Sequence, residues 1–116
     1  MGTTTRIGPT VLSPEAIESL PAEPLGHVEG ATHRVLWHSN GSVAGLLTLP
    51  AGSRLGAHSH RVHHHHVWVV DGSAIVLGQL LEPGSYVHVP AGVEHDIDTT
   101  DTDGCTVFYL YAPPGG

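Results

Sequence analysis

From residue 33 onward, short apolar segments alternate with turn-forming residues, and this rhythm limits the possible folds more than any other feature. The 15 glycines and 9 prolines of the chain supply many of the turns. The segments show no helical periodicity and follow one another at a spacing of roughly ten residues. The expected strands are 33–38, 42–49, 54–60, 65–71, 74–80, 86–89, 94–99 and 106–111. Short strands at this spacing predict an all-β fold, either a sandwich or a barrel.

Residues 1–30 differ in character, and we expect them to form an N-terminal arm outside a β domain that spans residues 31–116. The arm contains one expected short helix, at residues 13–20. Ser13 would cap this helix, Pro14 would take its first position and Pro21 would end it. No internal repeat or second domain is visible.

Charge and composition argue against several classes of partner. The formal net charge is −7, and four arginines are too few to form the basic surface that nucleic-acid binding requires. No segment approaches the roughly 18 apolar residues of a membrane span, and the N-terminus lacks a signal-peptide pattern. The single Cys105 excludes an internal disulfide and a cysteine-based zinc site. We therefore expect a cytoplasmic protein that binds neither nucleic acid nor membrane.

Histidines gather in the segment GAHSHRVHHHH (56–66), and their spacing is that of metal ligands. His58 and His60 stand two apart in an expected strand, so both rings leave the same face, about 7 Å apart at their bases. Two such rings can bind one ion. The run His63–His66 follows, and His95 stands alone further along the chain. The sequence therefore predicts a metal site.

Glycine, proline and histidine spacings over residues 52–99 resemble the two sequence motifs of the cupin family. In the first motif a glycine, a His-x-His pair, a glutamate and a second glycine follow at fixed spacings; in the second, a glycine, Pro-x-Gly, a histidine and an asparagine do. The matching residues are Gly52, His58, His60 and Gly72 for the first motif and Gly84, Pro90, Gly92 and His95 for the second, with Thr99 at the asparagine position. The resemblance implies a cupin fold, a double-stranded β-helix or jelly-roll barrel.

Histidine replaces the usual glutamate ligand of the first motif, which makes the sequence similar to the four-histidine cupins. A four-residue spacer after His60, and the count back from Gly72, both select His65, whereas a three-residue spacer selects His64. Strand alternation places His65 on the opposite face from His64 and His66. We favour His65. The resemblance then implies one divalent transition metal, with Fe, Mn, Ni, Cu and Zn not distinguished, held by His58, His60, His65 and His95.

Four neutral imidazoles leave the full +2 charge on the ion, which makes it a stronger Lewis acid than a site with a glutamate would. The similar four-histidine cupins include dioxygenases and a polyketide cyclase. We therefore expect an enzyme acting on a small organic molecule, first of all a dioxygenase that cleaves a C–C bond beside an enolisable carbonyl. A redox-neutral cyclase, isomerase or lyase is the alternative, and a non-enzymatic cupin that binds a metal or ligand is the third hypothesis.

Two further residues are candidates for catalysis. His88 precedes the Pro-x-Gly turn and could transfer protons near the pocket, with structural packing as the competing interpretation. Tyr109 lies in the final strand and could line the pocket, although core packing explains it equally well. Both faces of this final strand are apolar, so we also expect a homodimer.

Overall fold

The structure is a computed structural model, and it describes residues 8–56 and 63–113. These residues form one short helix and eight β-strands. The elements are α1 (Pro14–Glu18), β1 (Glu23–Pro24), β2 (Thr32–Ser39), β3 (Ser42–Pro50), β4 (His64–Gly72), β5 (Ala74–Val76), β6 (Gln79–Leu81), β7 (Tyr86–Val89) and β8 (Gly104–Ala112). The predicted all-β class is confirmed.

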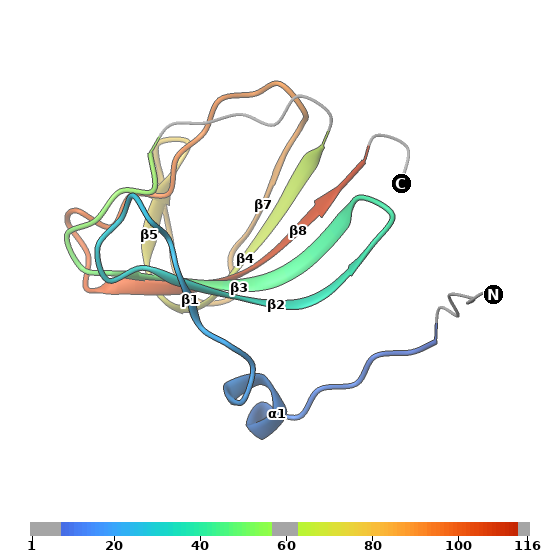
Figure 1. The fold of residues 1–116 in the computed structure, drawn as a ribbon. Helices are drawn as coiled ribbons and strands as arrows, with labels where there is room; N and C mark the ends of the chain where they lie inside the picture. The colour runs from blue at the N-terminus through green and yellow to red at the C-terminus, as the bar shows by residue number, and fades with distance from the viewer. Residues whose placement is uncertain (1–7, 57–62, 114–116) are drawn as a thin grey trace.

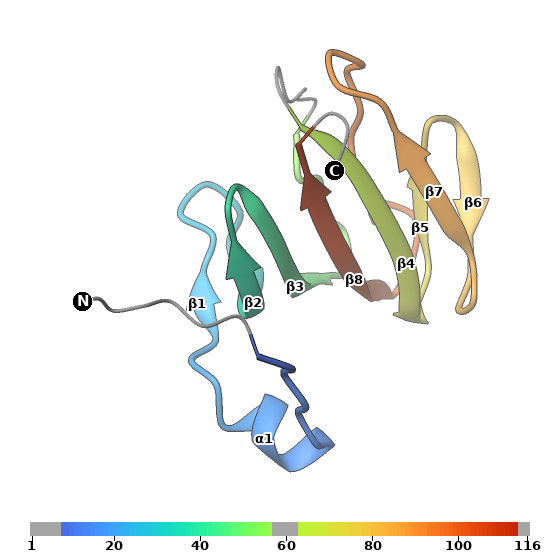
Figure 2. The same ribbon diagram turned by 90° about the vertical axis from the view of Figure 1, so that its right-hand side faces the viewer.

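Six of the strands form one antiparallel sheet in the order β1-β2-β3-β8-β4-β7, and β5 pairs with β6 in a second, two-stranded sheet. Figure 1 shows that the large sheet is strongly curved and that its concave side faces β5. In Figure 2 the β5–β6 pair lies near the end of the large sheet that carries β7. The chain thus wraps around one interior, as a β-barrel does.

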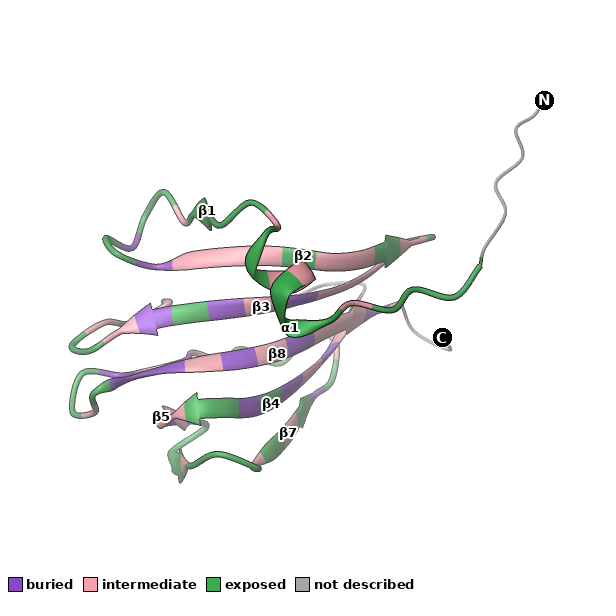
Figure 3. Cartoon of the chain, turned by 90° about the horizontal axis from the view of Figure 1, so that it is seen from below, coloured by how far each residue is buried: buried purple, intermediate pink, exposed green. Residues whose placement is uncertain are grey.

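Strand alternation directs one face of each central strand into this interior. In β4 the buried residues are His65, Val67 and Val69, and the residues between them are exposed or half-buried. In β8, Val107 and Tyr109 are buried in the same way. Figure 3 shows this as purple segments that alternate with pink and green along the strands. The inward face of β4 therefore combines two valines of the apolar core with a histidine.

The N-terminal arm begins its helix as the sequence predicts. The Ser13 side chain accepts a hydrogen bond from the Ala16 N–H at 3.1 Å, and Pro14 is the first helical residue. The helix ends at Glu18 and not at residue 20, because Ser19 caps it and donates its hydroxyl to the Glu15 carbonyl at 2.9 Å. No helix in residues 8–56 and 63–113 is long and apolar enough to cross a membrane.

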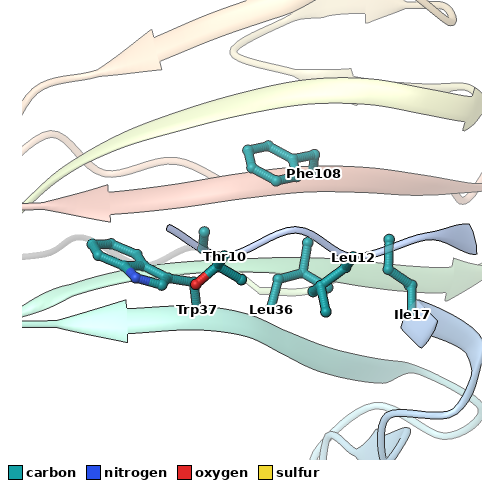
Figure 4. Close-up of a pocket in the computed structure, with 7 residues that line it drawn as sticks. Thr10, Leu12, Ile17, Leu36, Trp37 and Phe108 are labelled. Atoms are coloured by element: carbon teal, nitrogen blue, oxygen red, sulfur yellow. The ribbon is translucent and has the colours of Figure 1, made fainter. Parts of the chain in front are cut away.

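The arm also packs against the large sheet. Within the stretch expected to lie outside the β domain, β1 pairs with β2. Further back, side chains of the arm line a shallow pocket together with residues of β2 and β8 (Figure 4). The labelled lining residues are Thr10, Leu12, Ile17, Leu36, Trp37 and Phe108. The arm therefore covers part of the convex face of the sheet.

Two expected strands differ in the structure. Residues 74–80 form two strands and not one, because the chain turns at Leu77 and Gly78, with φ angles of 50° and 79°. A leucine in the left-handed region gives no turn signal of the Asn-Gly kind, so the sequence did not indicate this turn. Residues 94–99 form no regular strand. Within them, Asp98 forms isolated bridges to Arg54 and Ile75.

A third expected strand, 54–60, is only partly within the described residues. Of residues 54–56, Arg54 alone forms a β-bridge, and residues 57–60 lie outside the described part.

Thr99 fastens the chain segment that follows His95 to the turn after β3. Its side chain is fully buried, and its hydroxyl lies 2.7 Å from the Pro50 carbonyl and 3.0 Å from that of Ser53, to one of which it donates. The same oxygen accepts a hydrogen bond from the Ser53 N–H at 3.1 Å. One hydroxyl therefore satisfies backbone groups that the barrel end buries.

We expect the substitution Thr99→Val to lower the free energy of unfolding by about 1–3 kcal/mol, because it keeps the side-chain shape and removes the hydroxyl that the partly buried Ser53 N–H donates to. Thr100→Val is the matched control, since the Thr100 hydroxyl also donates a hydrogen bond but is exposed. Its effect should stay within about 0.5 kcal/mol. Urea unfolding of both variants tests this, and equal losses would contradict the role given to Thr99.

Candidate metal centre

Two of the four predicted metal ligands meet inside the barrel. His65 lies on the inward face of β4 and is 3% exposed, and His95 is 4% exposed. Nδ1 of His65 is 3.1 Å from Nε2 of His95, and the ring centroids are 5.2 Å apart. Residues 30 positions apart in sequence thus form a buried imidazole pair.

Backbone contacts hold the segment around His95 in place. The Leu55 N–H donates to the Ile97 carbonyl at 3.0 Å, and the Ile75 N–H donates to the Asp98 carbonyl at 2.8 Å. The Asp96 carboxylate accepts from the Gly56 N–H at 2.8 Å. These bonds fix the segment of His95 against β5 and against residues 55–56, which directly precede the part of the chain that carries His58.

The chemistry of this pair fits a divalent metal. Nδ1 of His95 lies 3.2 Å from the Val93 carbonyl, so an N–H at Nδ1 donates there and leaves the lone pair on Nε2. A ring oriented by a backbone carbonyl in this way is typical of metal-binding histidines. Two nitrogens that each lie about 2.1 Å from one ion can be at most about 4.2 Å apart. The observed 3.1 Å satisfies this limit.

The other two predicted ligands, His58 and His60, lie outside the described residues. The choice between His65 and His64 can be compared with the structure directly. His65 points inward with Val67 and Val69, and His64 lies on the opposite face. The alternation behind our preference for His65 is confirmed, while its role as a ligand stays a prediction.

A small cavity of about 180 Å³ lies beside His65. Its lining is largely apolar, and its residues are Leu25, His33, Leu47, Leu55, His65, Val67, Ile97, Val107, Tyr109 and Tyr111. The residues of this lining come from β2, β3, β4, β8 and the loops between strands. A cavity of this size and polarity suits a small, mostly apolar molecule.

Two tyrosines bring phenol groups to this cavity. Tyr111 stacks on His65, with ring centroids 4.1 Å apart and an interplanar angle of 30°. Burial, with a smaller contribution from the neighbouring Tyr109, raises the pKa of Tyr111 to about 12. Burial also raises the pKa of Tyr109. Both phenols are therefore protonated at neutral pH and can donate a hydrogen bond to an oxygen atom.

Tyr109, one of the two candidates for catalysis, lies at this cavity, and Gly45 makes room for it. Gly45 faces Tyr109 directly in the β3–β8 pairing, and a Cβ atom at position 45 would collide with the phenol. The tyrosine ring can therefore lie across β3 only because residue 45 has no side chain.

His88, the other candidate, is not brought together with His65 and His95. It is exposed on β7, directly opposite His66, and its Nε2 lies 3.1 Å from Nδ1 of His64. A role of His88 in proton transfer stays a prediction that the geometry of the cavity does not support.

His33 also lines the cavity, although the sequence pattern indicates only that it begins a strand. A register shift between Val35 and Trp37 interrupts the alternation of β2, so the inward face of this strand cannot be followed from the sequence.

The sequence of this chain matches a known protein family. The sequence profile of the ChrR cupin-like domain matches residues 12–113. The chain belongs to this cupin family. The match begins within the stretch that we had expected to form a separate arm, and it includes both predicted cupin motifs. A search of curated protein sequences found no match for this cupin.

Solved structures confirm the cupin fold. A predicted oxalate decarboxylase from Thermotoga maritima has a TM-score of 0.77 at 16% identity, with 90% of this cupin and 99% of that chain covered. The polyketide cyclase RemF from Streptomyces resistomycificus has a TM-score of 0.74 at 17% identity, covering 97% and 82%. A chain of the Rhodobacter sphaeroides SigE complex with the anti-sigma ChrR has a TM-score of 0.71 at 20% identity, covering 83% and 51%. The fold is therefore shared by proteins of quite different functions.

Proposed function

We propose that this cupin is a metal-dependent enzyme that acts on a small organic molecule with an enolisable carbonyl, and that it cleaves a C–C bond with dioxygen. The observation that carries the proposal is the buried pair His65 and His95, with nitrogens 3.1 Å apart, beside a small apolar cavity with two protonated phenols. Such a cavity supplies ligands for an ion and hydrogen-bond donors for an oxygen atom of the substrate.

His58 and His60 would complete the ligand set with His65 and His95. A divalent ion held there would supply a Lewis acid with its full +2 charge and, in the case of iron, a redox-active centre.

The side chains of the cavity have separate tasks in this proposal. The phenols of Tyr109 and Tyr111 donate hydrogen bonds to the carbonyl oxygen, and these bonds strengthen as negative charge develops on it. His33 is a candidate to accept the proton from the neighbouring carbon. Leucine and valine side chains exclude water and select an apolar substrate. These tasks favour the enolate form of a diketone or hydroxyketone.

A redox-neutral reaction is the second candidate, because the likeness to the polyketide cyclase RemF extends over 97% of this cupin. Cyclisation also proceeds through an enolate, so the same phenols and the same cavity would serve it.

The experiment compares the Fe(II)-loaded and Zn(II)-loaded proteins with a panel of small diketones and hydroxyketones. We expect one O₂ to be consumed for each molecule cleaved by the iron form and none by the zinc form, because zinc does not change its oxidation state. Equal turnover with zinc, without oxygen uptake, would replace the dioxygenase with a cyclase or isomerase. Absence of turnover in both the iron and the zinc form, at full metal occupancy, would favour a non-enzymatic cupin.

The same assay tests the phenols. Tyr109→Phe removes one donor to the developing negative charge and should lower kcat by roughly 10²-fold. Tyr86→Phe is the control, because Tyr86 is exposed on β7.

A further inference from the structure

The convex face of β4 and β7 carries a second group of histidines, separate from the pair inside the barrel. His64 and His66 alternate with His65 along β4, so their rings leave the opposite face of the sheet. His88 lies directly opposite His66 in the β4–β7 ladder. Both strands lie side by side at one end of the large sheet, where β7 is the last strand (Figure 2). We call His64, His66 and His88 the outer triad.

The three rings of the outer triad form a nearly equilateral triangle. Their centroids are 5.0 Å apart for His64 and His66, 5.0 Å for His66 and His88, and 5.2 Å for His64 and His88. One nitrogen from each ring lies within 4.8 Å of the others, and Nδ1 of His64 is 3.1 Å from Nε2 of His88.

These distances match three imidazoles around one tetrahedral ion. A nitrogen about 2.1 Å from Zn²⁺ places the centre of its ring about 3.2 Å from the metal, so rings at tetrahedral angles have centres about 5.2 Å apart. The triangle of ring centres already has this size. The ring nitrogens lie within 4.8 Å of one another, and rotation of the rings would have to bring them to the separation of about 3.4 Å that a tetrahedral ion requires.

Neighbouring side chains orient the outer triad. The Tyr86 hydroxyl lies 2.6 Å from Nδ1 of His66, and when this N–H donates to the phenol oxygen, Nε2 carries the lone pair. The Trp68 ring stacks on His66 with an interplanar angle of 20°. His88 is exposed, so an ion from solution can reach the triad without opening the barrel.

We propose that the outer triad is a second metal site, which binds a zinc-like divalent transition metal through His64, His66 and His88 and leaves a fourth position open to water. Neutral imidazoles favour Zn²⁺, Cu²⁺ and Ni²⁺ and disfavour Mg²⁺ and Ca²⁺, which prefer oxygen ligands. The site is built on two paired strands, and it does not depend on whether the interior pair binds a metal.

The experiment measures how many Zn²⁺ ions each chain binds at equilibrium, with Mg²⁺ in excess to occupy weak oxygen sites. We expect His88→Ala and His64→Ala each to bind one Zn²⁺ fewer than the wild-type protein. His65→Ala should leave the outer site filled. The decisive quantity is the difference in bound Zn²⁺ per chain between wild type and His88→Ala. This difference has the same meaning whether or not the interior pair binds a metal.

His63→Ala is the matched control. His63 belongs to the same tetrahistidine run, but its Nε2 lies 2.9 Å from the Gly41 carbonyl and it is not part of the outer triad. If the run bound zinc merely as a stretch of histidines, His63→Ala would lose as much zinc as His64→Ala. That result, or an unchanged zinc count in His88→Ala, would overturn the proposal. Unchanged zinc binding by His63→Ala, together with loss in the two triad variants, would support it.

Discussion

Replacing His95 with alanine should weaken metal binding inside the barrel at least about tenfold, because it removes one imidazole of a buried pair. His65→Ala should have the same effect, since in our proposal both rings bind the same ion. Titration with Fe²⁺ or Zn²⁺ in a His88→Ala background, where the outer triad is broken, measures the interior site alone.

His64→Ala in the same background is the control. His64 lies one residue from His65 but on the other face of β4, so the interior affinity should not change. A larger loss in His64→Ala than in His65→Ala would show that the third ligand is residue 64 and that our assignment is wrong. Unchanged affinity in both His65→Ala and His95→Ala would mean that this pair does not bind the metal.

The second large effect is expected at Gly72, where β4 ends. Its φ angle is +72°, and a Cβ atom there would collide with the Gly104 carbonyl oxygen and lie 2.9 Å from the Cys105 Cα. These are backbone atoms of β8, which is paired with β4 at this position, so they cannot easily move. We expect Gly72→Ala to lower the free energy of unfolding by about 2–5 kcal/mol, from left-handed strain plus overpacking.

Gly52→Ala separates these two causes. Gly52 has a φ angle of +73°, but a Cβ atom there would have no heavy atom within 4 Å. It should therefore show the strain alone, about 1–2 kcal/mol. Urea unfolding of both variants gives the comparison. Equal losses would mean that the approach of β8 to Gly72 costs nothing, and that the glycines at the two ends of the first cupin motif serve the same purpose.

Much of this architecture was predictable because it depends on local patterns. Alternation identified the inward face of β4, and the motif spacing paired His65 with His95 across 30 residues. The turn at Leu77 was missed because a leucine with positive φ carries no turn signal. His33 was missed because a bulge hides the inward face of its strand.

Like the turn at Leu77 and the position of His33, the outer triad could not be predicted from local sequence patterns. It depends on which residue of β7 lies opposite His66, and such a register between distant strands is set by the packing of the whole sheet. The homodimer that we expect from the apolar final strand stays a prediction.

The run of histidines at the start of β4 raises a question of folding accuracy. If β4 slipped by one residue against β8, a histidine would still enter the barrel. The histidines alone therefore make the slipped register only slightly less stable than the native one. Trp68 decides the register. In the slipped strand its indole would replace a valine in the interior, where Val67 and Val69 are almost fully buried. The bulky residue on the outside of the barrel therefore selects which histidine is inside.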